Sequence, residues 1–348
     1  MTELMDVNDR IKEIRDLKKL RHADLSEITG YSPNTVKKWL TNSNSKYYQP
    51  APIQALKILE KWLVDGDLIG DSIKTSRTSK ICAEIWASMN HKGGTAKTTS
   101  TINFGLMLAN QSNKNNPERK NKVLLVDADF QQNMSKSLIT FPGDIKVSVS
   151  DIVIMAAKGK KYIYKKTDVD YGLSVDLLAA TNNMSSDTAG IEPHELIYTL
   201  KEGLEWFKEH YDYILIDGLP SKGSWYVAVM AAADKVIIPF TPNKFDVWGV
   251  ADVFEHVKKL RLRGINNNVK VAAVFCSEIT KPYRVIDSVI IDEVKGKYPK
   301  EFCETLIRSS VKVKEGCDLA PPLAVNEYAP DTGVAEDYNK VLEFIKNS

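Results

Sequence analysis

The chain has few cysteines and no long apolar run, and each shortage excludes a class of protein. Its 348 residues include four cysteines: Cys82, Cys276, Cys303 and Cys317. They form no C-x-x-C pair and no zinc-ligand spacing with the five histidines. We therefore expect neither disulfides nor a zinc site, which is usual in a reducing cytoplasm. No apolar stretch reaches membrane-spanning length, and the charged N-terminus is unlike a signal peptide.

Positive and negative side chains are also nearly balanced in number. The chain has 47 Lys and Arg against 45 Asp and Glu, a net charge of +2. Bulk charge therefore does not indicate a nucleic-acid partner, and any DNA binding must come from local patches. Hydrophobic residues make up 43% of the chain, enough for a substantial core, and the length suggests one large or two unequal domains.

One glycine-containing loop, residues 91–99, is the most informative segment present. It reads H-K-G-G-T-A-K-T-T and lies between an alternating stretch typical of a strand (81–89) and an apolar stretch typical of a helix (102–109). Small residues let the backbone amides of such a loop face phosphate oxygens, and the helix directs its positive end at them. Lys97 would then reach the outer phosphates, and the Thr98 hydroxyl would bind Mg²⁺.

The spacing K-G-G-x-x-K-[ST]-[ST] resembles the deviant Walker A motif of the ParA/MinD ATPases. His91 and Ala96 stand where the ordinary phosphate loop has glycine, and a lysine, Lys92, is added at the start. The resemblance implies that Lys92 reaches across a dimer interface to the nucleotide of the partner subunit. It also implies that ATP contacts the whole loop: Lys92, Gly93, Gly94, Thr95, Ala96, Lys97, Thr98 and Thr99.

Two apolar runs end in acids. One ends in Asp127 and Asp129, and the other ends in Asp217. Unbroken apolar runs are typical of parallel strands buried on both faces, and α/β folds bind ligands at the carboxyl ends of such strands. The resemblance implies that Asp127 and Asp217 help to hold Mg²⁺ through water and that Asp129 orients the attacking water.

The family has proline at two positions where this chain has Phe130 and Leu219, which puts the stiffness of the two switch loops in question. Further strands are expected at 173–180, 235–242 and 269–276, and a last helix at 335–347. We therefore predict an α/β fold, a parallel sheet flanked by helices, for residues 81–348. The resemblance covers roughly residues 80–345.

Residues 1–64 are predicted to form a small helical domain, joined to the rest by a linker at 65–80. A short helix from Asp24, a glycine turn and a second helix capped by Ser32 resemble a helix-turn-helix. The alternative is a helical hairpin with a solvated basic face. An apolar face over residues 4–20 indicates a helix that either packs on its own domain or forms a dimer seam. The residues expected to face DNA are Asn34, Thr35, Lys37 and Lys38.

Two further basic groups have open roles. The run 158–166 interleaves lysines with tyrosines, so that it either contacts nucleic acid or forms a solvated loop or hairpin. Arg308, Lys312 and Lys314 either form the family's non-specific DNA surface or are solvated. The final helix is unlike the lysine-rich amphipathic tail of MinD-like membrane binders.

These residues and the resemblance predict a plasmid or chromosome partition ATPase that is cytoplasmic and nucleoid-associated. ATP and Mg²⁺ would build a homodimer that binds DNA without sequence preference and makes no membrane contact. Slow ATP hydrolysis, stimulated by a ParB-like centromere-binding protein, would release the homodimer from DNA. The catalytic residues would be Lys92, Lys97 and Asp129. The N-terminal domain would bind operator DNA for autoregulation. The alternatives are a nucleotide-sensing transcription regulator and a protein-positioning ATPase of the same superfamily.

Overall fold

The computed structural model describes residues 7–18, 20–29, 33–41, 45, 50–51, 55–56, 59, 82–139, 145–220 and 223–348. The chain divides into two compact units, residues 1–79 and 80–348, and each unit has its own hydrophobic core. The predicted linker and most of the predicted helix at 53–64 lie outside the described residues, as do Gly30 and Ser32 of the predicted turn.

Three helices make up most of the described part of the first unit: α1 (Val7–Lys18), α2 (His22–Thr29) and α3 (Pro33–Trp39). Asn8 joins two segments of this unit, because its side chain donates to the Trp39 carbonyl (2.8 Å) and accepts from the Ala51 amide (2.7 Å). Ile11 and Ile14, from the apolar face of α1, are buried in the core of this unit, which agrees with the first of the two alternatives. The buried core consists of Ile11, Ile14, Leu25, Val36, Trp39, Ala51, Ala55, Leu56 and Leu59.

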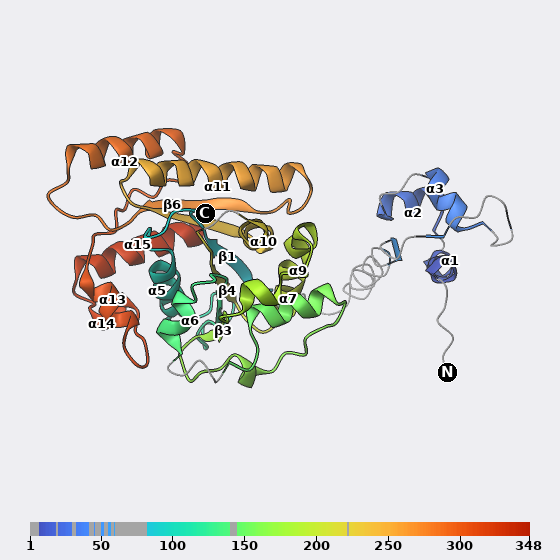
Figure 1. Ribbon diagram of the computed structural model, residues 1–348, viewed down its shortest axis with the longest axis horizontal. Helices are drawn as coiled ribbons and strands as arrows, with labels where there is room; N and C mark the ends of the chain where they lie inside the picture. Colours follow the sequence, from blue (N-terminus) through green and yellow to red (C-terminus); the bar gives the residue numbers. More distant parts are fainter. Residues whose placement is uncertain are drawn as a thin grey trace. The chain divides into compact units, whose positions relative to one another are not determined.

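The second unit is built on a six-stranded parallel sheet (Figure 1), which confirms the predicted α/β fold. Its spatial order is β3-β2-β4-β1-β5-β6. The register pairs Asp217 with Ser88 on one side and with Asp127 on the other, so the carboxyl ends of β1, β4 and β2 lie side by side. The strands are β1 (Glu84–Ser88), β2 (Val123–Asp127), β3 (Asp176–Leu178), β4 (Tyr213–Asp217), β5 (Lys235–Phe240) and β6 (Lys270–Cys276).

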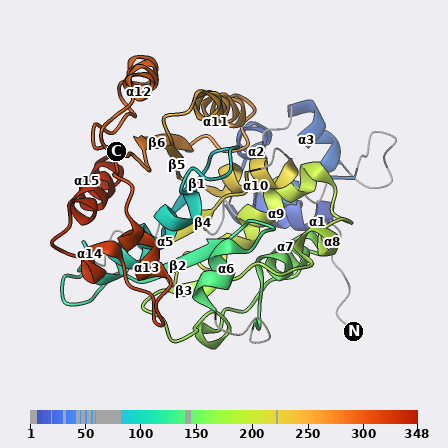
Figure 2. The same ribbon diagram turned by 60° about the vertical axis from the view of Figure 1, so that its left-hand side comes forward.

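Helices cover both faces of this sheet (Figures 1 and 2). Alternate residues of β1 show the division, because Ile85 and Ala87 belong to one core and Trp86 to the other. The first face is covered by α7 (Val149–Ala157), α8 (Met184–Asp187), α9 (Pro193–Glu205), α10 (Ser224–Ala232), α11 (Lys244–Leu262) and α12 (Val285–Lys297). The second is covered by α5 (Lys97–Asn110), α6 (Asn133–Leu138), α13 (Val311–Cys317), α14 (Val325–Tyr328) and α15 (Gly333–Asn347).

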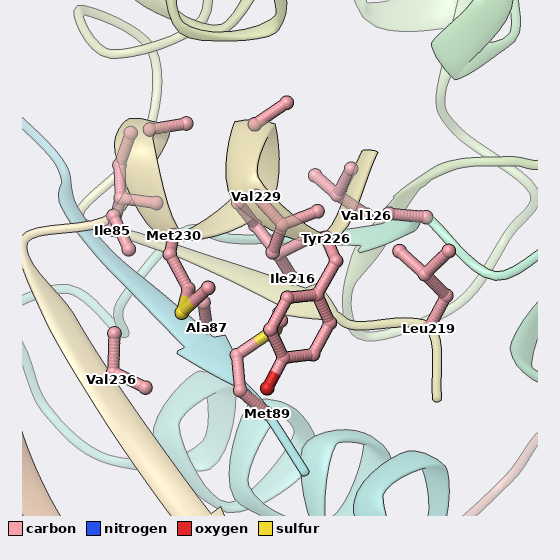
Figure 3. Close-up of a cluster of buried hydrophobic side chains, with 14 of the residues drawn as sticks. Ile85, Ala87, Met89, Val126, Ile216, Leu219, Tyr226, Val229, Met230 and Val236 are labelled. Carbon is pink, nitrogen blue, oxygen red and sulfur yellow. The ribbon is translucent and has the colours of Figure 1, made fainter. Parts of the chain in front are cut away.

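Helix α10 packs over the centre of the first face. Figure 3 shows Tyr226, Val229 and Met230 of this helix beside the apolar strand residues, with Tyr226 close to Met89. Met89 leads from β1 into the loop 91–99. Because close-packed apolar contacts of this kind leave little room for movement, the end of β1 is held firmly where the loop begins.

Candidate functional site

The loop after β1 turns sharply before it enters α5. Gly94 and Ala96 have φ angles of +78° and +61°, in the left-handed region that strains any residue with a Cβ. Helix α5 begins at Lys97, earlier than the predicted stretch at 102–109, so Lys97, Thr98 and Thr99 form its first turn. The amides of a first turn have no partners within the helix and carry the positive end of its dipole, which favours an anion at this loop.

Lys97 is the buried cation of the site. Its Nζ donates to the carbonyl of Lys92 at 2.8 Å, and the residue is 7% exposed. Burial lowers the pKa of Lys97, while the carboxylates of Asp217 and Asp129 act in the opposite direction. An ammonium group in this position can exchange its carbonyl for the oxygens of a bound phosphate.

Only one of the two carboxylate oxygens of Asp217, at the end of β4, has a hydrogen-bond partner among the described residues. Its Oδ2 accepts a hydrogen bond from the Thr98 hydroxyl at 2.6 Å. Its Oδ1 is buried and has no hydrogen-bond partner among the described residues. Burial, together with the charge of Asp127, raises the pKa of Asp217 well above its usual value. A buried, half-bonded carboxylate is costly, and a cation at Oδ1 would relieve that cost.

The two acids that follow β2 have different surroundings. Asp127 accepts hydrogen bonds from the amide and hydroxyl of Ser135 (2.8 and 2.7 Å) and from the amide of Asp129 (3.1 Å). Burial raises the pKa of Asp127 to about 6. Asp129 accepts from the Gln131 amide at 3.0 Å and lines the cavity beside the phosphate loop. Asp127 is therefore fixed in place by the chain, whereas Asp129 faces the space where a ligand would lie.

That cavity has a volume of about 740 Å³, which suits a ligand of nucleotide size. Several predicted residues form its wall: Gly93, Gly94, Ala96, Lys97, Thr98, Thr99, Asp129 and Lys314. The rest were not predicted as site residues: Ile102, Gln131, Asn133, Lys136, Ser137, Pro220, Cys317 and Asp318. Gln131, Asn133 and Pro220 belong to the two switch segments that resemble those of the family, and Lys136 follows the first of them. The resemblance also places the C-terminal segment near the nucleotide, but only the folded chain shows which residues of α13 reach the cavity.

The oxygen donors of the site fit Mg²⁺. This ion binds through one or two carboxylates and completes its shell with substrate phosphates and water. Such oxygen donors are present on Asp217, Asp127 and the Thr98 hydroxyl. Oδ1 of Asp217 has no hydrogen-bond partner among the described residues and is therefore available to a cation. In the described ranges no group of three or more His, Cys, Asp or Glu could hold a metal alone.

Lys92 is not among the residues that line this cavity. Its side chain is exposed, and no hydrogen bond or ion pair engages its Nζ within the part of the chain that the structure describes. The first turns of α11 lie against the same loop, because a Cβ on Gly249 would lie 3.2 Å from Nδ1 of His91. Phe245 and Trp248 of these turns are each 58% exposed and contact each other edge to face, with centroids 5.5 Å apart.

The α3 residues that are predicted to bind DNA lie on the solvent-facing side of this helix. Asn34, Lys37 and Lys38 are exposed and Thr35 is half-buried, whereas Val36 and Trp39 of the same helix are buried. The helix therefore separates an apolar inner face from a polar and basic outer face. DNA binding by this face stays a prediction.

The three predicted C-terminal cations do not form one free patch. Arg308 makes a bidentate pair with Asp337 (2.6 and 2.9 Å). Lys312 pairs with Glu315 at 2.8 Å, and Lys314 lines the nucleotide-sized cavity. A role for these residues in DNA binding also stays a prediction.

Comparison with known proteins identifies the family. A family model described as an AAA domain matches residues 83–271, more than half of the chain. Sporulation initiation inhibitor protein Soj of Bacillus subtilis is 30% identical over 261 residues, which cover 73% of this chain and 95% of Soj. The chain belongs to the ParA/MinD family of ATPases.

Two further matches agree with this ParA/MinD assignment. Chromosome-partitioning ATPase Soj of Treponema pallidum is 30% identical over 262 residues, which cover 74% of this chain and 94% of that protein. A putative plasmid partition protein from Borrelia burgdorferi B31, solved with AMPPNP, shares the fold with a TM-score of 0.57 at 21% identity. That match covers 76% of this chain and 99% of the solved one. Among the described residues, no helix combines the length and apolar character needed to cross a membrane.

Proposed function

We propose that this ParA/MinD ATPase is a partition ATPase that binds ATP with Mg²⁺, dimerises on it and hydrolyses it slowly. The observation that carries the proposal is the loop 91–99, in which a buried Lys97 lines the cavity and an exposed Lys92 does not. Relatives named for chromosome and plasmid partition, one of them solved with AMPPNP, support both the ligand and the process.

The residues around the cavity have separate tasks in phosphoryl transfer to water. Thr98, Asp127 and Asp217 hold Mg²⁺, which neutralises charge on the phosphates when it is bound. Lys97 and the loop amides bind the outer phosphates and stabilise the charge that develops during transfer. Asp129, which faces the cavity, orients the attacking water.

The exposed side of the loop is suited to self-association. Lys92 has no partner within the described part of its own chain, and the exposed pair Phe245 and Trp248 lies on the helix that packs against the same loop. A twofold dimer would bury the aromatic pair, as protein interfaces commonly do. The same dimer would bring Lys92 to the nucleotide of the partner subunit.

The ATP-bound homodimer would bind nucleoid DNA in the cytoplasm without sequence preference. A ParB-like centromere-binding protein would stimulate hydrolysis and release the dimer from DNA. The N-terminal unit would bind operator DNA through the outward residues of α3, which supports autoregulation. The proposed partners are therefore nucleoid DNA, a ParB-like protein and operator DNA.

Binding to random-sequence duplex DNA tests the cycle, measured without nucleotide, with ADP, and with ATP and Mg²⁺. Salt is held fixed, because backbone binding depends steeply on it. We expect only ATP to promote binding. Lys97→Ala should lose both ATP and DNA binding, whereas Lys92→Ala should keep ATP binding and lose dimerisation and DNA binding. Lys114→Ala, at an exposed lysine outside the site, is the control and should behave as the wild type.

The same experiment separates the alternatives. If ATP changes nothing, the partition switch is wrong. Tight binding to one operator through α3 would then favour a transcription regulator. If no DNA binds under any condition, a protein-positioning ATPase of the same family is favoured.

A further inference from the structure

The segment 158–166, which follows α7 (Figure 1), carries charge that the nucleotide cycle does not use. It reads K-G-K-K-Y-I-Y-K-K, with five lysines and no acid. Tyr162 is buried and Tyr164 is half-buried, so both tyrosines turn toward the protein. The residues turned outward are Lys158, Lys160, Lys161, Ile163, Lys165 and Lys166.

Aromatic contacts fix the path of this segment. Tyr162 stacks on Phe207 with ring centroids 5.5 Å apart, and Tyr164 stacks on His210 at 3.8 Å. The hydroxyl of Tyr164 also lies 3.2 Å from that of Tyr211. Because the inward side chains are anchored, the outward lysines project from a preorganised backbone, which lowers the entropy lost when they bind a ligand.

The acids near the segment are already paired. Asp176 accepts from Lys166 (2.6 Å) and from the hydroxyl of Tyr211 (2.7 Å). Asp168 accepts from the hydroxyl of Tyr162 at 2.8 Å. No hydrogen bond or ion pair between described residues engages the ammonium groups of the other four lysines, Lys158, Lys160, Lys161 and Lys165.

We propose that Lys158, Lys160, Lys161 and Lys165 form a surface that binds the phosphate backbone of duplex DNA. This inference rests on the proposed function, because it assigns the proposed DNA binding to a particular surface of the protein. Two of the C-terminal cations expected to bind DNA, Arg308 and Lys312, are neutralised by acids, whereas no acid among the described residues forms an ion pair with the four lysines of this surface. Lysines on flexible stems contact phosphates without reading bases, which fits binding without sequence preference.

The chemistry of the surface favours DNA over other anionic partners. Ile163, which is 77% exposed, is its single outward apolar residue, whereas a segment that inserts into a membrane surface needs a broad apolar face. A protein interface usually centres on aromatic side chains, and here both tyrosines point inward. The remaining exposed side chains of the surface are positively charged lysines, which complement the negative charges of a phosphate backbone.

The test is a full-length variant with Lys→Gln at 158, 160, 161 and 165, compared with the wild type in ATP and Mg²⁺. We expect its affinity for random-sequence duplex DNA to fall about tenfold or more. The slope of log K against log salt should become shallower by about 3–4, since each lost phosphate contact removes about 0.9. ATP hydrolysis without DNA and the thermal midpoint should stay unchanged, because these lysines touch neither the cavity nor the core.

A charge-matched control removes the same number of positive charges from the end of α11 and the residue after it. Lys258, Lys259, Arg261 and Arg263 are exposed there, but Glu301 lines the same hollow as Lys258 and Arg261. The corresponding quadruple Gln variant should keep most of its DNA affinity. Equal losses in the two variants would assign the effect to bulk charge and overturn the inference.

Three other outcomes would also overturn it. If the four-lysine variant binds DNA as well as the wild type, the inference fails while the proposed function stands. If it binds DNA normally but loses binding to phosphatidylglycerol vesicles that the wild type retains, the surface serves lipid instead. If the wild type itself binds no DNA in ATP, the proposed function and the inference fail together.

Discussion

Gly218 lies where the ends of β1 and β4 come closest together. Its amide donates to the Ser88 carbonyl at 3.1 Å. A Cβ on Gly218 would lie 2.6 Å from that same oxygen and would collide with the sulfur of Met89. The phosphate loop begins just after one of these strand ends, and Asp217 stands at the other. A single added methyl group would therefore disturb both halves of the site.

Gly218→Ala should lower the free energy of unfolding by about 1–3 kcal/mol, as overpacking commonly does. It should also weaken ATP binding, because the strand ends must separate and Asp217 would shift away from Thr98. Urea unfolding and ATP titration measure the two effects. Gly296→Ala on α12 is the control, since its Cβ would meet nothing within 4 Å. That substitution should be neutral or stabilise by up to about 1 kcal/mol. Equal losses at the two positions would contradict the explanation.

Arg119 fixes the start of β4 through a bidentate pair with Asp212 (2.6 and 2.8 Å). Burial raises the pKa of Asp212, but hydrogen bonds from Arg119 and from the Lys122 amide outweigh it, so the pKa lies below its usual value. The stability that Asp212 contributes is therefore fully present above its unfolded pKa of about 3.9 and is lost as pH falls through the lowered value.

Arg119→Gln should cost about 1–3 kcal/mol at neutral pH, because it leaves a largely buried carboxylate without its partner. The difference from the wild type should shrink only below about pH 4. Urea unfolding across this range measures it. Lys114→Gln removes the same charge from an exposed site and should change stability by less than about 0.5 kcal/mol. A difference that stays constant down to about pH 3 would exclude the ion pair as its cause.

At the scale of elements, the two residues that replace prolines of the family lie in the loops after β2 and β4 and line the same hollow. Phe130 packs edge to face on Trp225 of α10, with ring centroids 6.2 Å apart, and Leu219 is buried in the same core. The three side chains line one hollow of about 250 Å³. Proline would stiffen each loop through its own backbone, whereas here packing on α10 restrains the loop after β2.

A double-mutant cycle of Phe130→Ala and Trp225→Ala tests whether the loop after β2 is coupled to α10. We expect a coupling of about 0.5–1.5 kcal/mol in the free energy of unfolding without nucleotide. Phe245 and Trp248 form a matched pair with a similar edge-to-face angle of 86°, but both are 58% exposed and should couple more weakly. Additive effects of Phe130→Ala and Trp225→Ala would mean that this loop and α10 are independent.

At the scale of the whole molecule, the two units have separate cores. The core of the first unit contains Trp39 and Leu25, and the cores of the second lie on the two faces of its sheet. We therefore expect two unfolding transitions. Because the proposed site for ATP and Mg²⁺ lies in the second unit, these ligands should shift only one of the two transitions, by about 2.7 kcal/mol at an ATP concentration of about 100 Kd.

Thermal unfolding with and without ATP, and with ATP plus EDTA, measures this shift. Chelation should remove most of it, because Asp217 would again hold an unpaired oxygen. Trp39→Ala, in a position that is 1% exposed, should lower the other transition by about 3–5 kcal/mol and leave the ATP shift unchanged. One cooperative transition that ATP moves as a whole would contradict the separation.

Local patterns predicted the sheet better than they predicted the helices. The strand 84–88 was expected from its alternating pattern, and the strands 123–127, 213–217, 235–240 and 270–276 from their apolar runs. Helix α10 was missed because S-W-Y-V-A-V-M-A-A is apolar on all sides and has no helical period. The start of α5 was missed because Lys97, Thr98 and Thr99 give no apolar signal.

The sequence alone determined the phosphate loop and the acids at the ends of two strands, because consecutive residues and strand periodicity set those features locally. It also determined which face of α3 is polar. Only the tertiary structure decided that Lys136 and Lys314 meet at the cavity, that Arg308 is neutralised by Asp337, and that no described acid forms an ion pair with the four lysines at 158–165. Pairing and burial depend on which distant segments pack together, and no local pattern of residues encodes those contacts.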